Sequence, residues 1–256
     1  MGLLNYKIAW FTEGGWQGKV SLDNPNMRND VSTKWLLGAE HYPIFQLPQV
    51  LQHFGENHFD FGIVTLPKTN VDKLMTFDMM GDLKKLCRKT ISMQEGPHWY
   101  FQDYTMEQQI WWYNSLTEFD MLFAHNWKDV NYYRGITNKP VQKMPTLMLA
   151  ERLGIIPRNE WSDAVMIGGN MVRWYGGFDS YVVAQQFNMP ISAPSMGRKI
   201  DREDEMDIQH LPYMTWVEWM NSLSQYHVGV HMMPTHAAGT FTLNCAFHGI
   251  PCIGYK

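Results

Sequence analysis

Residues 228–255 read VGVHMMPTHAAGTFTLNCAFHGIPCIGY, and this stretch is the most informative part of the chain. A short apolar run ends at Pro234, a loop of small residues follows, and residues 240–248 have a helix-like composition. Gly249 and Pro251 end that helix before a second apolar run. The order strand, loop, helix, strand is typical of a parallel α/β sheet, where the N–H groups at a helix N-terminus can bind an anion. A structural βαβ unit without a ligand is the alternative.

Strand-like and helix-like segments alternate through the rest of the chain, which predicts βαβ units and parallel sheets. In the first half, strands are predicted at residues 6–12, 41–47, 59–66, 88–93 and 119–124, with a helix at 106–116. In the second half, strands are predicted at 163–167, 189–193, 228–232 and 250–253, with a helix at 178–187. Pro140, Pro145 and Pro157 punctuate the chain between the two series. We therefore predict an α/β protein of two Rossmann-like domains, residues 1–145 and 146–256.

The composition of the chain is that of a globular protein. Of its 256 residues, 45% are hydrophobic and 18% are charged, so it can form a packed core. The formal net charge of -4 argues against a surface used as a whole for nucleic-acid binding, although one basic groove would be enough for DNA. No apolar run is long enough to span a membrane. Three cysteines without metal-ligand spacing fit free thiols in a reducing compartment, so we expect a cytoplasmic protein.

Two glycine pairs follow predicted strands, one in each half of the chain. Gly14 and Gly15 follow the first strand, and Gly168 and Gly169 follow the first strand of the second half. Glycines allow the backbone to approach a ligand closely, and Arg173 adds a fixed positive charge near the second pair. Backbone N–H donors and one cation together make a reasonable diphosphate cradle. The glycine spacing does not match the dinucleotide fingerprint, and an ordinary turn is the alternative reading for the second pair.

The loop at residues 94–100, QEGPHWY, follows another predicted strand and carries two candidate bases. Glu95 and His98 lie three residues apart there, and either could take a proton from a hydroxyl group within hydrogen-bond distance. The alternative is that both side chains fix an aromatic-rich loop. The chain contains no serine-hydrolase or P-loop motif, and its histidines show no metal-ligand spacing.

The order of these elements resembles that of the GT-B fold glycosyltransferases, in which two Rossmann-like domains face each other across a cleft. Residues 216–255 resemble the donor-binding signature of that family, and the sequence G-I-P at 249–251 matches its G-x-P turn. In many retaining members, two glutamates lie eight positions apart in this segment. The matching positions here hold His236 and Asn244, with Gly239 at the loop glycine. The chain ends soon after the turn, where the fold usually adds helices, so we expect a short C-terminal end.

The resemblance implies transfer of a sugar, a hexose or a pentose, from a nucleotide-diphosphate-sugar to an acceptor hydroxyl, with UDP as the expected nucleotide. A glycan, a small molecule or a modified nucleobase would each fit as the acceptor, although the net charge does not favour DNA. A non-catalytic nucleotide-sugar binding protein and a sugar-nucleotide epimerase are the alternatives. The resemblance implies no cofactor and no metal ion, because basic side chains and helix dipoles neutralise the leaving diphosphate in many members. Retention or inversion stays open.

The resemblance also assigns roles to individual residues. The predicted donor-binding residues are Gly14, Gly15, Gly168, Gly169, Arg173, His236, Gly239, Thr240 and Asn244. The predicted catalytic residues are Glu95 and His98 as candidate bases, and Arg173, which would stabilise the leaving diphosphate. The Asn244 amide would bind a ribose hydroxyl, and His236 would donate to a sugar hydroxyl or a phosphate.

Overall fold

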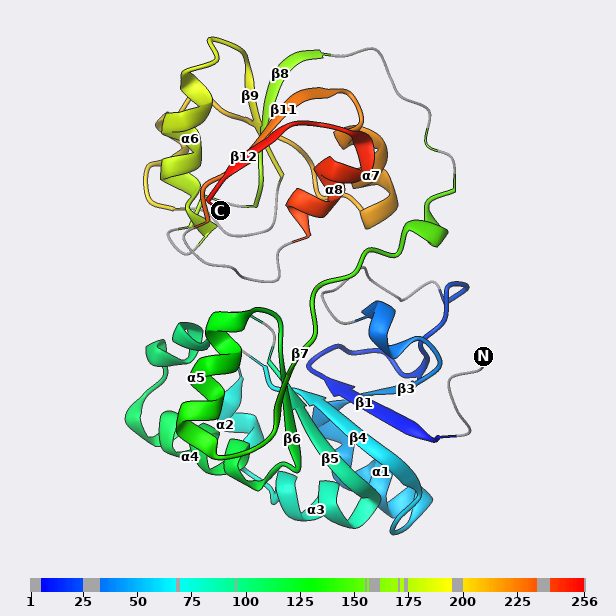
Figure 1. Cartoon of the computed structure of the whole chain (residues 1–256). Helices are drawn as coiled ribbons and strands as arrows, with labels where there is room; N and C mark the ends of the chain where they lie inside the picture. Colours follow the sequence, from blue (N-terminus) through cyan, green and yellow to red (C-terminus); the bar gives the residue numbers. More distant parts are fainter. Residues whose placement is uncertain are drawn as a thin grey trace. The chain divides into compact units, whose positions relative to one another are not determined.

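The computed structural model describes residues 6–24, 33–67, 70–94, 96–154, 156, 162–169, 171–172, 175–194, 200–233 and 240–255. The chain forms two compact units that divide between Leu147 and Met148. Each unit contains its own sheet of mostly parallel strands, with helices in the connections between strands (Figure 1). The predicted class, α/β with two Rossmann-like domains, is confirmed. Of the helices in the described part of the chain, none is long and apolar enough to cross a membrane.

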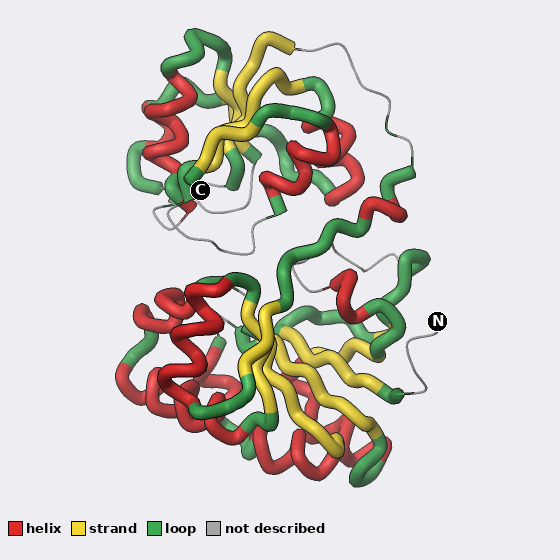
Figure 2. The backbone as a smooth tube through the Cα atoms, viewed as in Figure 1, coloured by secondary structure: helices red, strands yellow, loops and turns green. Residues whose placement is uncertain are grey.

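The first unit contains a seven-stranded sheet in the order β2-β3-β1-β4-β5-β6-β7. The strands are β1 (Ile8–Thr12), β2 (Gly18–Lys19), β3 (Glu40–Pro43), β4 (Phe59–Thr65), β5 (Cys87–Met93), β6 (Met121–Ala124) and β7 (Val141–Lys143). The helices are α1 (Leu47–Phe54), α2 (Val71–Leu74), α3 (Met79–Leu86), α4 (Met106–Glu118) and α5 (Trp127–Thr137). Only the short edge strand β2 pairs antiparallel with its neighbour β3, so this unit has the βαβ pattern expected from the sequence (Figure 2).

Helices α1, α3, α4 and α5 share one apolar cluster with the sheet of the first unit. Phe11 of β1, Val64 of β4 and Leu122 of β6 are fully buried in this cluster. Burial of each such side chain stabilises the fold by roughly 1.5–3 kcal/mol. Helix α4 begins at a capping box, in which the Thr105 hydroxyl accepts from the N–H of Gln108 and the Gln108 side chain accepts from the N–H of Thr105.

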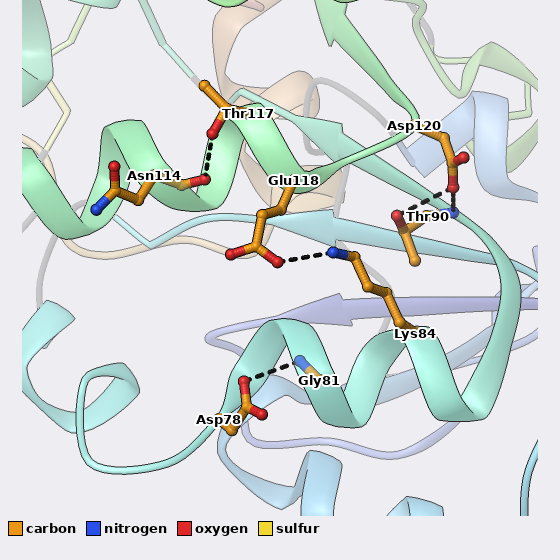
Figure 3. A network of polar contacts seen from close by, with 8 residues as sticks. All are labelled: Asp78, Gly81, Lys84, Thr90, Asn114, Thr117, Glu118 and Asp120. Carbon is orange, nitrogen blue, oxygen red and sulfur yellow. Dashed lines mark hydrogen bonds and ion pairs between the residues drawn. The ribbon is translucent and has the colours of Figure 1, made fainter.

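Polar contacts outside this cluster link the ends of helices and strands (Figure 3). Lys84 of α3 pairs with Glu118 at the end of α4, with 2.7 Å between Nζ and Oε2. Asp120 precedes β6 and accepts from the backbone N–H of Thr90 in β5 at 2.9 Å. The Lys84–Glu118 pair is about half exposed, so it contributes at most about 1 kcal/mol.

The predicted strand at residues 41–47 is wrong beyond Pro43. Strand β3 ends at Pro43, a 3-10 turn covers Ile44–Gln46, and α1 begins at Leu47. Pro48 lies in the first turn of α1, where its missing N–H costs nothing and its fixed φ suits a helix. The apolar run is buried as expected, but proline makes its last residues the start of a helix.

The second unit contains a five-stranded sheet in the order β10-β9-β8-β11-β12, and every pair in it is parallel. The strands are β8 (Ser162–Ile167), β9 (Ile191–Ala193), β10 (Gln209–His210), β11 (Tyr226–His231) and β12 (Cys252–Gly254). The helices are α6 (Gly177–Gln185), α7 (Trp216–Leu223) and α8 (Phe241–His248). Helix α6 packs on one face of this sheet, and α7 and α8 pack on the other (Figure 1). The strand–loop–helix–strand order predicted for residues 228–255 is confirmed.

In each sheet the strand order reverses at one position. Strand β1 lies between β3 and β4 in the first unit, and β8 lies between β9 and β11 in the second. Open α/β sheets bind ligands beside such a switch point, at the carboxyl ends of the strands. The loops that follow β1 and β4, and those that follow β8 and β11, are therefore the candidate positions for ligands.

Candidate functional site

The structure describes seven of the predicted site residues. They are Gly14, Gly15 and His98 in the first unit, and Gly168, Gly169, Thr240 and Asn244 in the second. Glu95, Arg173, His236 and Gly239 lie outside the described residues, so their roles stay predictions.

Gly14 and Gly15 lie in the turn that directly follows β1, and only one of them has a backbone donor available for a ligand. The N–H of Gly14 donates to Thr12 Oγ1 at 3.0 Å. Gly15 is exposed, and a Cβ placed on it would meet no atom within 4 Å. Its N–H has no hydrogen-bond partner among the residues that the structure describes. Gly15 can therefore donate to an anion at the switch point of the first sheet.

The carboxylate of Asp129 in helix α5 holds His98, and this partner was not predicted from the sequence. Asp129 Oδ1 lies 2.7 Å from His98 Nδ1 and 3.1 Å from the backbone nitrogen of His98. The ring of His98 also stacks on Tyr132, with 4.1 Å between ring centroids. Because the carboxylate can only accept at Nδ1, the neutral ring carries its lone pair on Nε2. The His98 side chain is 25% exposed, so it is partly open to solvent.

Asp129 is itself fixed by the start of α5. Asn126 caps this helix by accepting from the Asp129 N–H at 2.9 Å, and its amide donates to Asp129 Oδ2 at 2.6 Å. Asp129 is 2% exposed, and its two oxygens accept from His98 and Asn126. A histidine oriented by a buried carboxylate can act as a general base, because the carboxylate stabilises the imidazolium that forms.

In the second unit, Gly168 serves helix packing and Gly169 offers a free donor. The N–H of Gly168 donates to the carbonyl of Val230 at 2.8 Å, and a Cβ on Gly168 would lie 2.4 Å from the Phe241 ring. The sheet therefore already uses the Gly168 N–H, and a donor-binding role for Gly168 stays a prediction. Gly169 has a φ of +87°, and its N–H donates to no other described residue. It is the donor of this pair that a phosphate can reach.

The loops after β8 and β11 meet at the switch point of the second sheet. Gly176, which precedes α6, lies so close to the end of β11 that a Cβ there would be 1.9 Å from the carbonyl oxygen of Met232. Buried Ser180 links the two segments by donating to the Gly176 carbonyl at 2.7 Å and accepting from the Met232 N–H at 2.8 Å. Gly176 thus allows close backbone packing between the two loops, while Gly177 packs against the backbone of Met171 in its own loop.

Thr240 precedes α8 and is partly exposed, whereas Asn244 lies inside the unit. Asn244 is 2% exposed. Its amide, oriented to satisfy both neighbours, accepts from Trp219 Nε1 at 3.0 Å and donates to the Thr240 carbonyl at 3.2 Å. These contacts connect α7 to α8 and, together with the burial of Asn244, leave little of its amide accessible to a ribose hydroxyl.

Replacing Asn244 with alanine should therefore reduce stability and leave nucleotide affinity unchanged. The change removes the partner of the Trp219 indole N–H, which costs about 1–3 kcal/mol when such a group is left buried and unpaired. Denaturant unfolding and calorimetric titration with UDP measure the two effects, and exposed Thr242→Ala on the same helix is the matched control. A loss of UDP affinity without a loss of stability would restore the ribose role predicted from sequence.

One histidine in each unit has a pKa below its ordinary range. His41 of β3 is fully buried, and burial lowers its pKa from 6.5 to about 4. His231 ends β11 with its ring 5.6 Å from the Phe241 ring, and burial lowers its pKa from 6.5 to about 4. Both rings are therefore neutral at physiological pH.

We expect stability to fall as the pH drops from 6.5 to 4. In this window the unfolded chain binds a proton on each of these two histidines while the folded rings stay neutral, so protons favour unfolding. This loss of stability is absent above pH 6.5 and reaches its limit below pH 4. At that limit it amounts to at most about 3 kcal/mol for each ring. Urea unfolding at a series of pH values measures it, with His41→Phe and His231→Phe as variants that should flatten the slope. Equal stability at pH 7 and pH 5 would contradict it.

Within the described part of the chain, no group of three or more His, Cys, Asp or Glu side chains is arranged to hold a metal ion. Cys87, Cys245 and Cys252 are all free thiols.

No protein-family model matches the chain, and no curated protein matches it in sequence. Solved structures match it over nearly its whole length. An alpha-glucosyltransferase in complex with UDP superposes with a TM-score of 0.63 at 12% identity, covering 98% of this chain and 81% of the other. A complex of alpha-glucosyltransferase with UDP and a 13-mer DNA containing an HMU base gives 0.64 at 12% identity, covering 98% and 80%.

A third similar structure is Anabaena HepE in complex with UDP-glucose, with a TM-score of 0.61 at 11% identity. It covers 98% of this chain and 81% of HepE. At such identities the likeness concerns the fold, and it agrees with the two doubly wound sheets described above. The chain therefore has the GT-B fold of these glycosyltransferases, as the sequence predicted.

Proposed function

We propose that this protein is a glycosyltransferase that moves a hexose from a UDP-sugar to an acceptor hydroxyl. The observation that carries the proposal is the match over 98% of the chain to GT-B structures that hold UDP or UDP-glucose. Unpartnered backbone donors at both switch points support it, because a diphosphate is the group that such donors bind. No observation favours a pure binding protein or an epimerase, and the experiment below separates both from a transferase.

The donor would bind to the second unit. The Gly169 N–H and the N-terminus of the eight-residue helix α8 lie at the carboxyl ends of β8 and β11, where they can bind a diphosphate. Arg173 would add a fixed positive charge there, and His236 and Gly239 would complete the loop before α8. As the bond between sugar and phosphate breaks, these groups would stabilise the charge that develops on the leaving UDP. We propose that these groups neutralise the diphosphate without a metal ion or a cofactor.

The acceptor would be activated by the first unit. His98 Nε2 would take the proton of the acceptor hydroxyl. At the same time, the oxygen of that hydroxyl would form the new bond to the anomeric carbon of the donor sugar. The Asp129 carboxylate, 2.7 Å from Nδ1, would stabilise the imidazolium that results. Glu95 is the second candidate base. Free thiols at all three cysteines support our proposal of a cytoplasmic location, where nucleotide-sugars would be the available donors.

UDP release is the experiment that tests this function. Purified protein is incubated with UDP-glucose, UDP-galactose, UDP-N-acetylglucosamine or GDP-mannose, with and without a set of glycan and small-molecule acceptors. We expect slow UDP release from one UDP-sugar alone and faster release with an acceptor. Binding without release would identify a binding protein, and a change of sugar identity without acceptor would identify an epimerase. No binding and no release with any donor would overturn the proposal.

A further inference from the structure

A chain of four polar groups underlies the turn after β1. The Gly14 N–H lies 3.0 Å from Thr12 Oγ1, and that oxygen lies 2.7 Å from His41 Nε2. On the other side of the ring, His41 Nδ1 lies 2.8 Å from the carbonyl oxygen of Trp16. The chain therefore connects the residue before Gly15 to the residue after it.

The direction of every hydrogen bond in this chain is determined. The His41 ring is neutral, because burial lowers its pKa to about 4. The Trp16 carbonyl can only accept, so Nδ1 carries the proton and Nε2 accepts from the Thr12 hydroxyl. The Thr12 oxygen then accepts from the Gly14 N–H. Each donor in this chain therefore has an acceptor. The neutral His41 ring provides one donor, the Nδ1–H group, and one acceptor, Nε2.

Rings on two sides hold His41 in this orientation. The Trp16 ring stacks on it with 3.9 Å between centroids and 23° between planes. Trp10 of β1 approaches it at 69° with 5.1 Å between centroids, and the Trp10 indole N–H donates to Thr65 Oγ1 at 3.0 Å. An apolar side chain would fill this buried space without the cost of burying an imidazole. The two ring nitrogens of His41 instead bind Thr12, before Gly15, and Trp16, after it. The polar atoms of His41 therefore hold this turn.

We propose that His41, through Thr12 and Trp16, is the positioning residue that aims the Gly15 N–H at a phosphate of the nucleotide-sugar. This inference rests on the proposed function, because it gives the turn an anionic ligand. With Gly14 tied to Thr12 and the Trp16 carbonyl tied to His41, the peptide group between Gly14 and Gly15 has fixed neighbours on both sides. A donor held in place before the ligand arrives loses little conformational freedom on binding.

Thr12 provides the sharpest test, because Thr12→Val keeps the shape of the side chain and removes only the hydroxyl. Thr12→Ser keeps the hydroxyl and is the matched control. Calorimetric titration with UDP gives the affinity of each protein, and thermal unfolding reports its stability. We expect Thr12→Val to weaken UDP binding about 10-fold, because the Gly14 N–H and His41 Nε2 lose their partner and the Gly15 N–H is no longer held in place before the ligand binds; the affinity of Thr12→Ser should stay within about 2-fold of the wild type. His41→Phe should weaken UDP binding in the same direction.

The outcomes separate this inference from the proposed function. If the wild type binds UDP and Thr12→Val binds it with the same affinity, the positioning role is overturned and the proposed function stands. A wild-type protein that binds neither UDP nor any UDP-sugar would overturn the function itself. Lower stability of Thr12→Val with unchanged UDP affinity would mean that the polar chain serves folding alone, which would also overturn the inference. Weaker binding at unchanged melting temperature, restored by serine, supports it.

Discussion

Replacing His98 with asparagine should lower the rate of sugar transfer by about 100-fold to 10,000-fold, the range that a general base contributes. The asparagine amide can still donate to Asp129, which lies 2.7 Å from His98 Nδ1, so the loop keeps its anchor. The variant has no basic nitrogen at the position of Nε2, and the acceptor hydroxyl loses its proton acceptor. UDP release in the presence of acceptor measures the effect.

Donor affinity is the internal control for this variant. We expect calorimetric titration to give His98→Asn the same UDP affinity as the wild type, because His98 is not among the groups proposed to bind the diphosphate. Asp129→Asn should also slow transfer, since its amide can donate to Nδ1 and thereby place the proton on Nε2. If His98→Asn kept a transfer rate within about 3-fold of the wild type, the base would be another residue, and Glu95 would be the next to test.

The largest loss of stability is expected from Gly176→Ala. A Cβ at this position would lie 1.9 Å from the Met232 carbonyl oxygen, and the φ of +63° is unfavourable for alanine. The loops after β8 and β11 would have to separate, which should destabilise the second unit by more than about 3 kcal/mol. Unfolding followed by tryptophan fluorescence and calorimetry should show the second unit melting earlier, with the transition of the first unit unchanged.

Gly249 provides a matched control for the contact at Gly176. Its φ of +66° is nearly the same, but a Cβ there would meet no atom within 4 Å. Gly249→Ala should therefore cost only the backbone strain, about 1 kcal/mol. Equal destabilisation by the two alanines would show that the close approach to Met232 carries no energetic weight.

Local sequence patterns predicted most of the strands and helices, because they depend on neighbouring residues. The apolar run at 228–232 and the Gly-Ile-Pro turn at 249–251 bracket β11, α8 and β12 without reference to the rest of the chain. The run at 41–47 was ambiguous, since a short apolar run suits a strand or a buried helix equally. Pro48 decided it by starting α1.

The candidate site was harder to predict because its contacts join distant residues. Asp129 lies 31 positions from His98, and the only local signal was the Asn-x-x-Asp spacing that caps α5. A glycine after a strand shows that the backbone approaches something, but not what. Gly168 turned out to face the Phe241 ring. In the same way, only the packing of α7 against α8 shows that the Asn244 amide is already bound.

Hydrogen–deuterium exchange with saturating UDP tests the donor role of the second unit most directly. If that unit binds the donor, exchange should slow in peptides that contain Gly169 and the first turn of α8, while peptides from α4 exchange as before. These are the positions where a diphosphate would accept from backbone N–H groups. Slower exchange confined to the first unit, or no change with UDP or any other nucleoside diphosphate, would contradict a nucleotide-sugar transferase.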